Sequence, residues 1–271
     1  MQKLSGQEIS ESLIDSLKSK PTPKKILAAV LVGSEPSSIS FLNQKGKAAK
    51  ILGIDFRIYK FSSDLKNDDL RKEVGKISNQ GSVGGVIIQL PLPEHINRYY
   101  ILNVIPREKD VDVLGERAIG AVYAGRNQVL PPAAAVVKEI CERQGYGLKN
   151  KNIVVLGIGI VTGKPVALWL MNESNNLTII RSGGDLGKLR EADLVISGAG
   201  KPGLIDPKNL KKGAAVIDFG YEEKRGKLSG DLDTSDEKSL EHLKFYTPTP
   251  GGTGPIVVAM LLRNFYELNG N

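Results

Sequence analysis

The sequence predicts an α/β protein built from two αβα lobes, each with a mainly parallel sheet. Strand-like and helix-like segments alternate along most of the chain, and such alternation is typical of βαβ units. The length of 271 residues exceeds the usual size of a single compact domain. The alternation also stops after residue 105 and starts again near Gly147, which indicates a boundary between two lobes there.

The first half of the chain supplies the elements of the first lobe. In chain order they are a helix at residues 7–18, a strand at 25–33, a helix from Pro36 that carries Phe41 and Lys45, a strand at 54–61, a helix at 64–77 and a strand at 83–93. Apolar residues at helical spacing support the helices, and apolar runs or strict alternation support the strands. Gly33 ends the first strand, and two prolines end the last one.

The second half repeats this pattern. After the loop at residues 105–115, an irregular stretch runs to Leu130, and Pro132 then opens an alanine-rich helix. The later elements are a strand at residues 152–157, a helix at 163–173, strands at 177–183, 192–200 and 214–220, and a final helix at 255–269. We therefore expect residues 1–146, joined by the final helix, to form one domain and residues 147–254 to form the other.

Composition and charge exclude several classes of function. The formal net charge is +7, yet Lys and Arg are scattered among Asp and Glu, so we expect no nucleic-acid partner. Cys141 is the only cysteine, and His95 and His242 are isolated, so no disulfide, metal site or catalytic triad is predicted. The first residues lack the apolar core of a signal peptide and no apolar run reaches membrane-spanning length, so we expect a cytoplasmic protein without a membrane partner.

A glycine-rich turn follows the strand at residues 152–157 and precedes a helix. Gly157, Gly159 and Gly163 permit a tight turn whose amides approach a pyrophosphate at a helix N-terminus. The spacing is one residue longer than in the usual dinucleotide fingerprint, and a purely structural turn is the alternative. The ending Gly163-Lys164 suggests a phosphate-binding loop of the NTPase type, but Pro165 stands where the Mg²⁺-binding hydroxyl is needed.

The end of the next strand indicates which dinucleotide binds. A carboxylate at this position favours NAD, whereas a basic residue suits the extra phosphate of NADP. Arg181 and Ser182 place a cation and a hydroxyl there, although Asp185 lies close in sequence. We expect NADP, with NAD possible, and the alternative is that Arg181 is an ordinary solvated residue.

Polar residues at element ends in the first half form a candidate site. Lys45 lies one helical turn beyond Phe41, so both side chains point to the same side of the helix. An amine held against apolar surface loses part of its proton affinity and can act in acid–base chemistry. Gln89 ends a strand and Asp112 lies in a loop, which would bring an amine, an amide and a carboxylate to one cleft. The alternatives are a surface lysine and an ordinary turn aspartate.

Several motifs of this chain occur together, and in the same order, in one known family. They read VGSEPSS, K.KAA..LGI, IIQLPLP, P.EKDVD, GKPVA, ADLVISGAGKPGLI, VIDFGY, GDLD and TPTPGGTGP. Along nearly its whole length the chain resembles the bifunctional methylenetetrahydrofolate dehydrogenase/methenyltetrahydrofolate cyclohydrolase family, the FolD type. The combination of QLPLP with PGG.GP is specific to that family.

The resemblance implies two lobes separated by a cleft, the C-terminal one a Rossmann-type dinucleotide-binding domain. It also implies NADP- or NAD-dependent oxidation of 5,10-methylenetetrahydrofolate, followed by hydrolysis of the methenyl form to 10-formyltetrahydrofolate, in a homodimer. By resemblance, Lys45 is the lysine that promotes attack of water, Gln89 adjusts that lysine and Asp112 grips the pterin ring. The implied substrate contacts are Phe41, Pro250, Gly251 and Gly252, and the implied cofactor contacts are Gly157, Ile158, Gly159, Gly163, Lys164, Arg181, Ser182 and Tyr221.

The chain also departs from the family pattern. Tyrosine is usual at Phe41, glycine at Val113, serine at Gly159 and threonine at Val257, and the usual CTP is replaced by Leu130-Pro131-Pro132. Each lost polar contact costs typically about 0.5–1.5 kcal/mol, or roughly two- to tenfold in binding or rate. The first hypothesis is therefore an enzyme with both activities, and the second is a diverged paralogue that keeps one activity or only binds folate or nucleotide. A dinucleotide oxidoreductase for another small acid is a third class, but it leaves QLPLP and PGG.GP unexplained.

Overall fold

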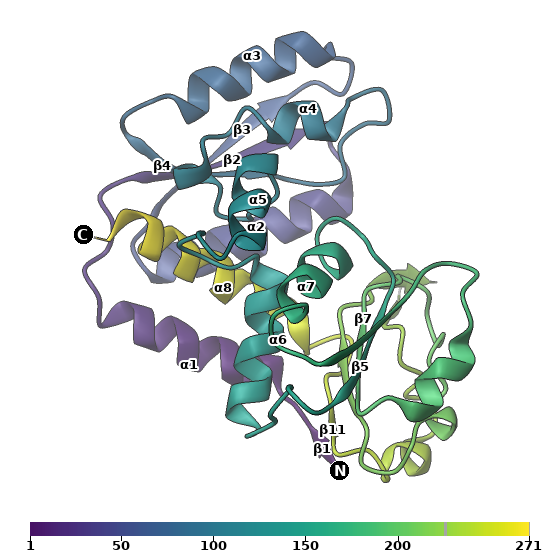
Figure 1. The fold of residues 1–271 in the computed structure, drawn as a ribbon. Helices are drawn as coiled ribbons and strands as arrows, with labels where there is room; N and C mark the ends of the chain where they lie inside the picture. The colour runs from purple at the N-terminus through teal and green to yellow at the C-terminus, as the bar shows by residue number, and fades with distance from the viewer. Residues whose placement is uncertain (225–226, 271) are drawn as a thin grey trace. The chain divides into compact units, whose positions relative to one another are not determined.

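The computed structural model describes residues 1–224 and 227–270, which fold into two compact units. The first, here called the N-terminal unit, comprises Ser12–Pro132 and Val258–Asn271. The second, called the C-terminal unit, comprises Met1–Glu11 and Ala133–Val257. Each unit contains a parallel sheet with helices, so the predicted α/β class is confirmed (Figure 1). The predicted domain boundaries at residues 147 and 254 remain a prediction.

The sheet of the N-terminal unit has three parallel strands in the order β3-β2-β4. Their bounds are β2 Ile26–Val32, β3 Asp55–Phe61 and β4 Val83–Ile88, and the helices of this unit include α2 Pro36–Ile51, α3 Asn67–Ser78 and α4 Arg98–Leu102. Every residue of the central strand β2 is buried, because it has a neighbouring strand on both edges and helices on both faces. Figure 1 shows α3 on one face of this sheet and α2 on the other.

The last helix, α8 (Thr253–Asn269), contributes its C-terminal part to the N-terminal unit. The fully buried ring of Phe265 packs on Gly85 of β4 so closely that a Cβ there would lie 2.8 Å from the ring. The Nδ2 atom of Asn264 donates hydrogen bonds to the carbonyl oxygens of Val111 and Leu130, at 2.9 and 2.8 Å. The helix therefore holds two loops in place as well as covering the sheet.

The sheet of the C-terminal unit has six parallel strands in the order β1-β11-β8-β7-β5-β6. Their bounds are β1 Gln2–Lys3, β5 Asn152–Leu156, β6 Asn176–Ile180, β7 Leu194–Ser197, β8 Ala215–Asp218 and β11 Phe245–Tyr246, and the helices are α6 Pro132–Arg143 and α7 Gly163–Leu170. From β5 the chain passes to β6 on one side and then returns to β7 on the other side. Ligands of such sheets bind at the carboxyl ends of the two strands where the order reverses, which here are β5 and β7.

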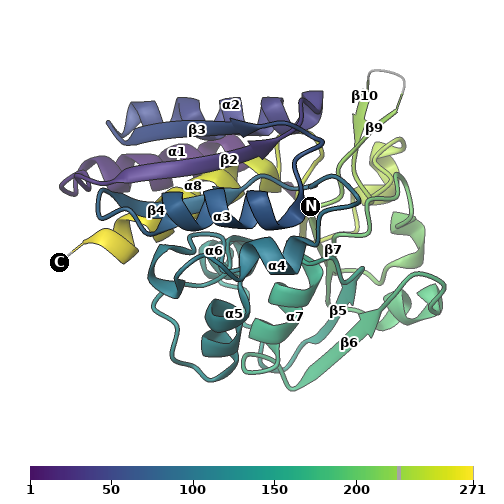
Figure 2. The same cartoon turned by 90° about the horizontal axis from the view of Figure 1, so that it is seen from above.

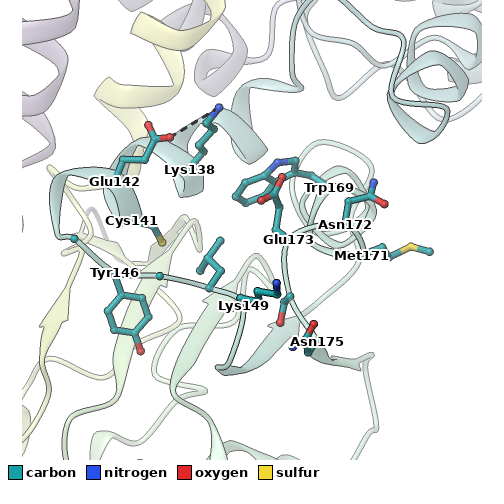
Figure 3. A pocket seen from close by; sticks show the side chains of 14 residues that line it. Lys138, Cys141, Glu142, Tyr146, Lys149, Trp169, Met171, Asn172, Glu173 and Asn175 are labelled. Atoms are coloured by element: carbon teal, nitrogen blue, oxygen red, sulfur yellow. Dashed lines mark ion pairs between the residues drawn. The ribbon is translucent and has the colours of Figure 1, made fainter.

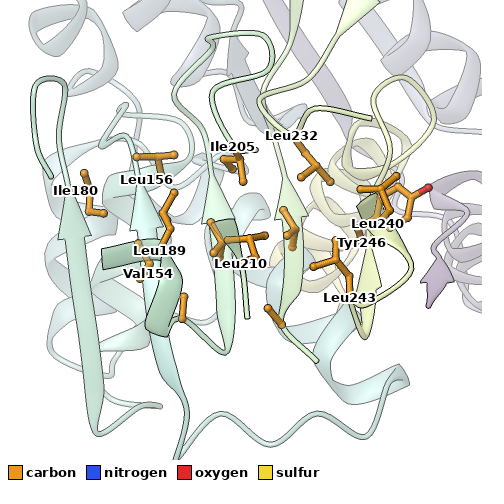
Figure 4. Close-up of a cluster of buried hydrophobic side chains, with 14 residues drawn as sticks. Val154, Leu156, Ile180, Leu189, Ile205, Leu210, Leu232, Leu240, Leu243 and Tyr246 are labelled. Carbon is orange, nitrogen blue, oxygen red and sulfur yellow. The ribbon is translucent and has the colours of Figure 1, made fainter. Parts of the chain in front are cut away.

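Apolar side chains of these strands form a core on one face of the sheet (Figure 4). Four 3-10 turns accompany the helices, namely η1 Arg107–Lys109 in the N-terminal unit and η2 Leu186–Glu191, η3 Pro207–Asn209 and η4 Glu237–Leu240 in the C-terminal unit. This core includes Leu189 from η2, Leu210 directly after η3 and Leu240 from η4. Short turns therefore cover this face of the sheet in place of long helices. A separate hairpin of β9 (Glu222–Lys224) and β10 (Lys227–Ser229) stands apart from the sheet (Figure 2).

Several elements were not predicted from the sequence, among them α4, β9, β10 and β11, and two others show the reason. Residues 2–3 form β1 at the edge of the C-terminal sheet, where Gln2 pairs with Phe245. A two-residue strand has no periodicity, and its partner lies at the other end of the chain. Within the stretch expected to be irregular, Glu116–Tyr123 form α5, a helix too short to establish a clear helical period. In the part of the chain that the structure describes, no helix has both the length and the apolar character to cross a membrane.

Candidate active site

The amine and the amide of the predicted site meet in the N-terminal unit. Lys45 lies on α2 and is half-buried, and Gln89 directly follows β4 and is buried. The Nζ atom of Lys45 donates to the Oε1 atom of Gln89 at 3.0 Å. The backbone N–H of Gln89 donates to Val30 of the neighbouring strand at 2.9 Å, which fixes where the side chain emerges from the sheet. The contact therefore depends on a helix and a strand end, both rigid elements.

Asp112 completes the group of three that the sequence predicted. Burial lowers the pKa of Lys45, and the negative charge of Asp112 opposes that shift. Burial likewise raises the pKa of Asp112, and the positive charge of Lys45 opposes it. Burial thus shifts the pKa of each group toward its neutral form, while the charge of each group favours the charged form of the other.

The loop that carries Asp112 is held by the side chain of Asp110 and by α8. The Oδ2 atom of Asp110 accepts from the N–H groups of Leu114 and Gly115, at 3.0 and 2.8 Å. Burial, together with the charge of Asp112, raises the pKa of Asp110 to about 6, although the backbone hydrogen bonds oppose this. Val113 is buried with a φ of 56°, a left-handed conformation that is strained for a β-branched residue. Asp110 is not among the predicted site residues, and the only signal for it in the sequence is a second aspartate two residues before Asp112.

Phe41 lies on α2 one turn before Lys45 and is half-buried. The two side chains therefore share one side of the helix, as the spacing predicts. The ring supplies a flat apolar surface, but it has no hydroxyl group to donate to or accept from the amine. This position thus lacks the polar contact that a tyrosine would provide.

The glycine turn lies in the C-terminal unit at the carboxyl end of β5. Gly157 has a φ of 81°, and its N–H donates to Ile180 of β6 at 2.8 Å. A Cβ on Gly163 would lie 1.9 Å from the carbonyl oxygen of Gly157, so a larger residue at 163 would fill the turn. Gly159 faces open space, while Ile158 is half-buried. The turn then leads into α7, whose dipole favours an anion beside the turn, although the N–H of Lys164 donates to Gly159 at 3.0 Å and Pro165 has no N–H.

The other predicted cofactor residues lie at the ends of neighbouring strands. Arg181 and Ser182 directly follow β6 and are exposed, and the exposed Lys164 is in the first turn of α7. The carboxylate of Asp185 accepts from the N–H of Gly187 and so begins the turn η2. Tyr221 follows β8 with 43% of its surface exposed. A cradle of backbone amides beside a cation and a hydroxyl fits a dinucleotide with an additional phosphate.

The loop of Pro250, Gly251 and Gly252 also belongs to the C-terminal unit. Gly251 has a φ of 89°, and its carbonyl oxygen accepts from the N–H of Gly6 at 2.8 Å. A Cβ on Gly252 would lie 2.3 Å from the carbonyl oxygen of Pro248. Glycines are therefore required by the shape of the loop itself.

Two buried carboxylates at the carboxyl edge of the C-terminal sheet were missed by the sequence analysis. Asp218 ends β8 with 1% of its surface exposed, and Asp231 is fully buried. Burial and the charge of Asp231 raise the pKa of Asp218 to about 7, against the effect of backbone hydrogen bonds. The available signal was an aspartate one or two residues from a glycine, Asp218 before Gly220 in VIDFG and Asp231 after Gly230 in GDLD.

A cavity of about 590 Å³ lies elsewhere, near the amino ends of β5 and β6 (Figure 3). Its lining includes Cys141 and Trp169, which the sequence assigns to the core, and none of the predicted site residues. Cys141 is 3% exposed, and burial raises its pKa to about 12, so it is not a nucleophile. In the described residues, no group of three or more His, Cys, Asp or Glu is arranged to hold a metal.

The fold and these two sites together define a dinucleotide-binding α/β protein with an amine–amide–carboxylate centre. Residues 3–112 match the catalytic domain of tetrahydrofolate dehydrogenase/cyclohydrolase, and residues 131–270 match its NAD(P)-binding domain. The chain belongs to the tetrahydrofolate dehydrogenase/cyclohydrolase family, which confirms the resemblance seen in the motifs.

Named relatives agree with this membership. The chain is 34% identical to the bifunctional protein FolD of Staphylococcus haemolyticus, over 96% of this chain and 94% of that protein. It is similar in structure to the bifunctional FolD dehydrogenase/cyclohydrolase of Campylobacter jejuni, with a TM-score of 0.94, 30% identity and coverage of 99% and 98% of the two chains. It is also similar to the Trypanosoma brucei FolD enzyme complexed with NADP and an inhibitor, with a TM-score of 0.91, 29% identity and coverage of 98% and 96%.

Proposed function

We propose that this protein oxidises 5,10-methylenetetrahydrofolate to the methenyl form with NADP and then hydrolyses the methenyl form to 10-formyltetrahydrofolate. The observation that carries the proposal is the half-buried amine of Lys45, held 3.0 Å from Gln89 and electrostatically coupled to Asp112. An amine with a lowered pKa can take a proton from the water that attacks the methenyl carbon. Family membership and the bifunctional relatives support both activities.

In the oxidation, the bound nicotinamide supplies the acceptor for the hydride that leaves the methylene carbon. The residues of this chain then bind and orient. Amides of the turn after Gly157, whose own N–H donates to Ile180, would bind the pyrophosphate, and Arg181 and Ser182 would take the additional phosphate of NADP. Asp112 accepts from the N–H groups of the pterin, and the ring of Phe41 stacks on it.

In the hydrolysis, water adds its oxygen to the methenyl carbon and loses one proton. The bond from that carbon to N5 then breaks, the remaining hydroxyl proton passes to N5, and the formyl group stays on N10. Lys45 receives the proton lost by the water, because burial favours its neutral form. Gln89 holds the amine in place without adding a charge. The ring of Phe41 excludes water from one side of the amine.

An absorbance assay that follows methenyltetrahydrofolate tests the proposal directly. With the purified protein, NADP and methylenetetrahydrofolate, the signal should rise and then decay, and NAD should support a slower rise. A folded protein that changes neither substrate with either cofactor contradicts the proposal.

The second candidate function is that of a paralogue that keeps only one activity or binds folate or nucleotide without turnover. The missing hydroxyls at Phe41, Pro131, Gly159 and Val257 favour it. In the same assay, this candidate predicts a rise without decay, a decay of added methenyltetrahydrofolate without a rise, or binding alone.

We also infer a cytoplasmic homodimer. Strand β6 ends the sheet among the described residues, and Ile179 on this strand is 48% exposed, while Met171 at the end of α7 is 61% exposed. An unpaired edge strand with exposed apolar side chains is suited to pair with a second copy. Light scattering should give the mass of a dimer for the wild type and of a monomer for Ile179→Lys, whereas the control Tyr123→Lys, at another exposed apolar position, should stay dimeric. A monomeric wild type overturns the inference.

A further inference from the structure

The loops at the carboxyl ends of β7 and β8 are organised by buried charge. Asp231 accepts four hydrogen bonds, all from the end of β7 and the loop that follows it. Its Oδ2 atom accepts from the Ser197 hydroxyl at 2.5 Å and from the N–H groups of Ala199 and Gly200 at 2.8 and 3.3 Å. Its Oδ1 atom accepts from the N–H of Lys201 at 2.6 Å. The loop 198–201 is thus wrapped around one carboxylate.

Asp218 organises the next loop in the same way. Its Oδ1 atom accepts from the N–H of Gly220 at 2.6 Å, and its Oδ2 atom accepts from the N–H of Leu232 at 2.9 Å. Leu232 directly follows Asp231, so Asp218 holds the segment that carries Asp231. Thr247 and Thr253 fix the backbone of Asp218 with hydrogen bonds of 2.7 and 2.8 Å.

Each carboxylate packs so closely on a glycine near the other aspartate that a Cβ would not fit there. A Cβ on Gly220 would lie 2.3 Å from the Cγ atom of Asp231, and a Cβ on Gly230 would lie 2.2 Å from the Oδ2 atom of Asp218. Two buried carboxylates near each other are costly for folding, because each loses hydration and the charge of Asp231 acts on Asp218. Such an arrangement is expected where it serves a site.

The loop 198–201 lies against the glycine turn. A Cβ on Gly157 would be 2.8 Å from the carbonyl oxygen of Gly198 and 2.9 Å from the Cα of Ala199. A Cβ on Gly198 would be 3.0 Å from the Cγ2 atom of Thr162, the residue before α7. These loops therefore meet between the ends of β5 and β7, where the order of the strands reverses and a dinucleotide binds.

We propose that Asp218 and Asp231 are positioning residues for the dinucleotide, because they hold the loops after β7 and β8 in the conformation that receives it. The inference rests on the proposed NADP-dependent function. The carboxylate of Asp231 also occupies the N–H groups of residues 199–201, so these amides are not free to bind phosphate. The phosphates are left to the glycine turn and to Arg181 and Ser182.

The test separates cofactor binding from the hydrolysis, which needs no cofactor. In Asp231→Asn, an NH2 group replaces one acceptor oxygen and leaves a buried N–H unpaired, so the Kd for NADPH should rise roughly tenfold. The kcat/KM for NADP should fall by a similar factor, while the KM for methylenetetrahydrofolate and the hydrolysis of added methenyltetrahydrofolate stay within about twofold of wild type. Asp218→Asn should likewise raise the Kd for NADPH and lower the kcat/KM for NADP.

Two further variants keep the test decisive. Ser197→Ala removes only one donor to Asp231 and is the milder variant if the aspartate variants fail to fold, and it should raise the Kd for NADPH about two- to fivefold. Asp206→Asn is the matched control, because this exposed aspartate accepts from the N–H of Lys208 only at the start of η3, and its Kd should not change.

The experiment distinguishes failure of the positioning role from failure of the proposed function. NADPH binding is measured by fluorescence and does not need turnover, and an inactive wild type contradicts the proposed function rather than this inference. An unchanged Kd for NADPH in every folded variant overturns the positioning role. Equal loss of oxidation and hydrolysis also overturns it, because that pattern reports general loss of folded protein.

Discussion

The Nζ atom of Lys45 lies 3.0 Å from the Oε1 atom of Gln89, and the Nε2 atom of the same amide donates to the carbonyl oxygen of Leu90 at 2.8 Å. The second hydrogen bond fixes the orientation of the amide, since a flipped amide would place its NH2 group against the amine and its oxygen against another oxygen. The amine is thus held by a neutral acceptor. Asp112 supplies the charge that acts on it.

Replacing that neutral acceptor by a charged one should block hydrolysis. Gln89→Glu places a carboxylate beside Lys45, which raises the pKa of the amine and keeps it protonated. We expect hydrolysis of methenyltetrahydrofolate at neutral pH to fall by roughly tenfold or more, with a smaller effect on oxidation. The measurement is the decay of methenyl absorbance against pH, and Gln89→Met is the uncharged control. A Glu variant as fast as wild type would show that the protonation state of Lys45 does not limit the step.

Removing the amine should separate the two activities. Lys45→Met keeps the length and apolar character of the side chain but removes the proton acceptor. Hydrolysis should be lost, while much of the oxidation remains, because hydride transfer needs no proton acceptor at this position. Both rates are measured with the same preparation of protein. Equal losses in both would mean that the lysine chiefly holds the substrate.

Placing a tyrosine at Phe41 tests whether the missing hydroxyl group limits the hydrolysis. Phe41→Tyr adds a hydroxyl one helical turn from Lys45, and one additional hydrogen bond is worth about 0.5–1.5 kcal/mol. The rate of hydrolysis should therefore rise roughly two- to tenfold. Phe41→Leu, which removes the ring, should instead raise the KM for the folate substrate. If the rate with tyrosine is unchanged, the missing hydroxyl is not limiting.

The left-handed backbone at Val113 predicts an unusual order of stability. At an ordinary buried position, glycine is less stable than alanine because it loses a methyl group and gains freedom in the unfolded chain. At a φ of 56°, a Cβ costs about 1–2 kcal/mol, which offsets that difference. Val113→Gly should therefore be at least as stable as Val113→Ala in urea unfolding. The control is the same pair of substitutions at Val111, which is equally buried but has no positive φ, and there the Ala variant should be more stable than the Gly variant. The same difference in unfolding free energy between Ala and Gly at both positions would contradict the prediction.

The raised pKa of Asp218 predicts how stability depends on pH. Its native pKa is about 7 and its ordinary value is 3.8, so between these values the unfolded chain has released a proton that the native state still holds. The free energy of unfolding contributed by this group should fall as pH rises from about 4 to about 7, by about 1.4 kcal/mol per pH unit and by about 4 kcal/mol at most. The pKa of Asp110 is raised to about 6, so the contribution of this group to the free energy of unfolding also falls as pH rises.

The variant Asp218→Asn cannot titrate, so its unfolding free energy should decline less steeply over this pH range. The control Asp206→Asn should follow the wild type, since that aspartate is exposed. Chemical denaturation at several pH values measures the slopes. Parallel curves for wild type and Asp218→Asn would show that Asp218 is ionised throughout.

Much of the fold could be predicted because its signals are local. The apolar run of β2, the helical spacing of α2 and the glycines after β5 each lie within a few consecutive residues. The candidate site residues Lys45 and Gln89 were found for the same reason, since both lie at places that such elements define. The short helix α5 and strand β1 escaped detection because so few residues carry no clear period.

The sequence by itself determined the alternation of strands and helices, the dinucleotide turn and the types of side chain available for chemistry. Only the tertiary structure decided which of these groups meet: Lys45 with Gln89, Asn264 with the loop of Val111, and Asp231 with the loop that starts at Gly198. Periodicity and turn chemistry act between near neighbours in the chain. Contacts between distant segments depend on how the sheets are ordered and packed, and no local pattern carries that information.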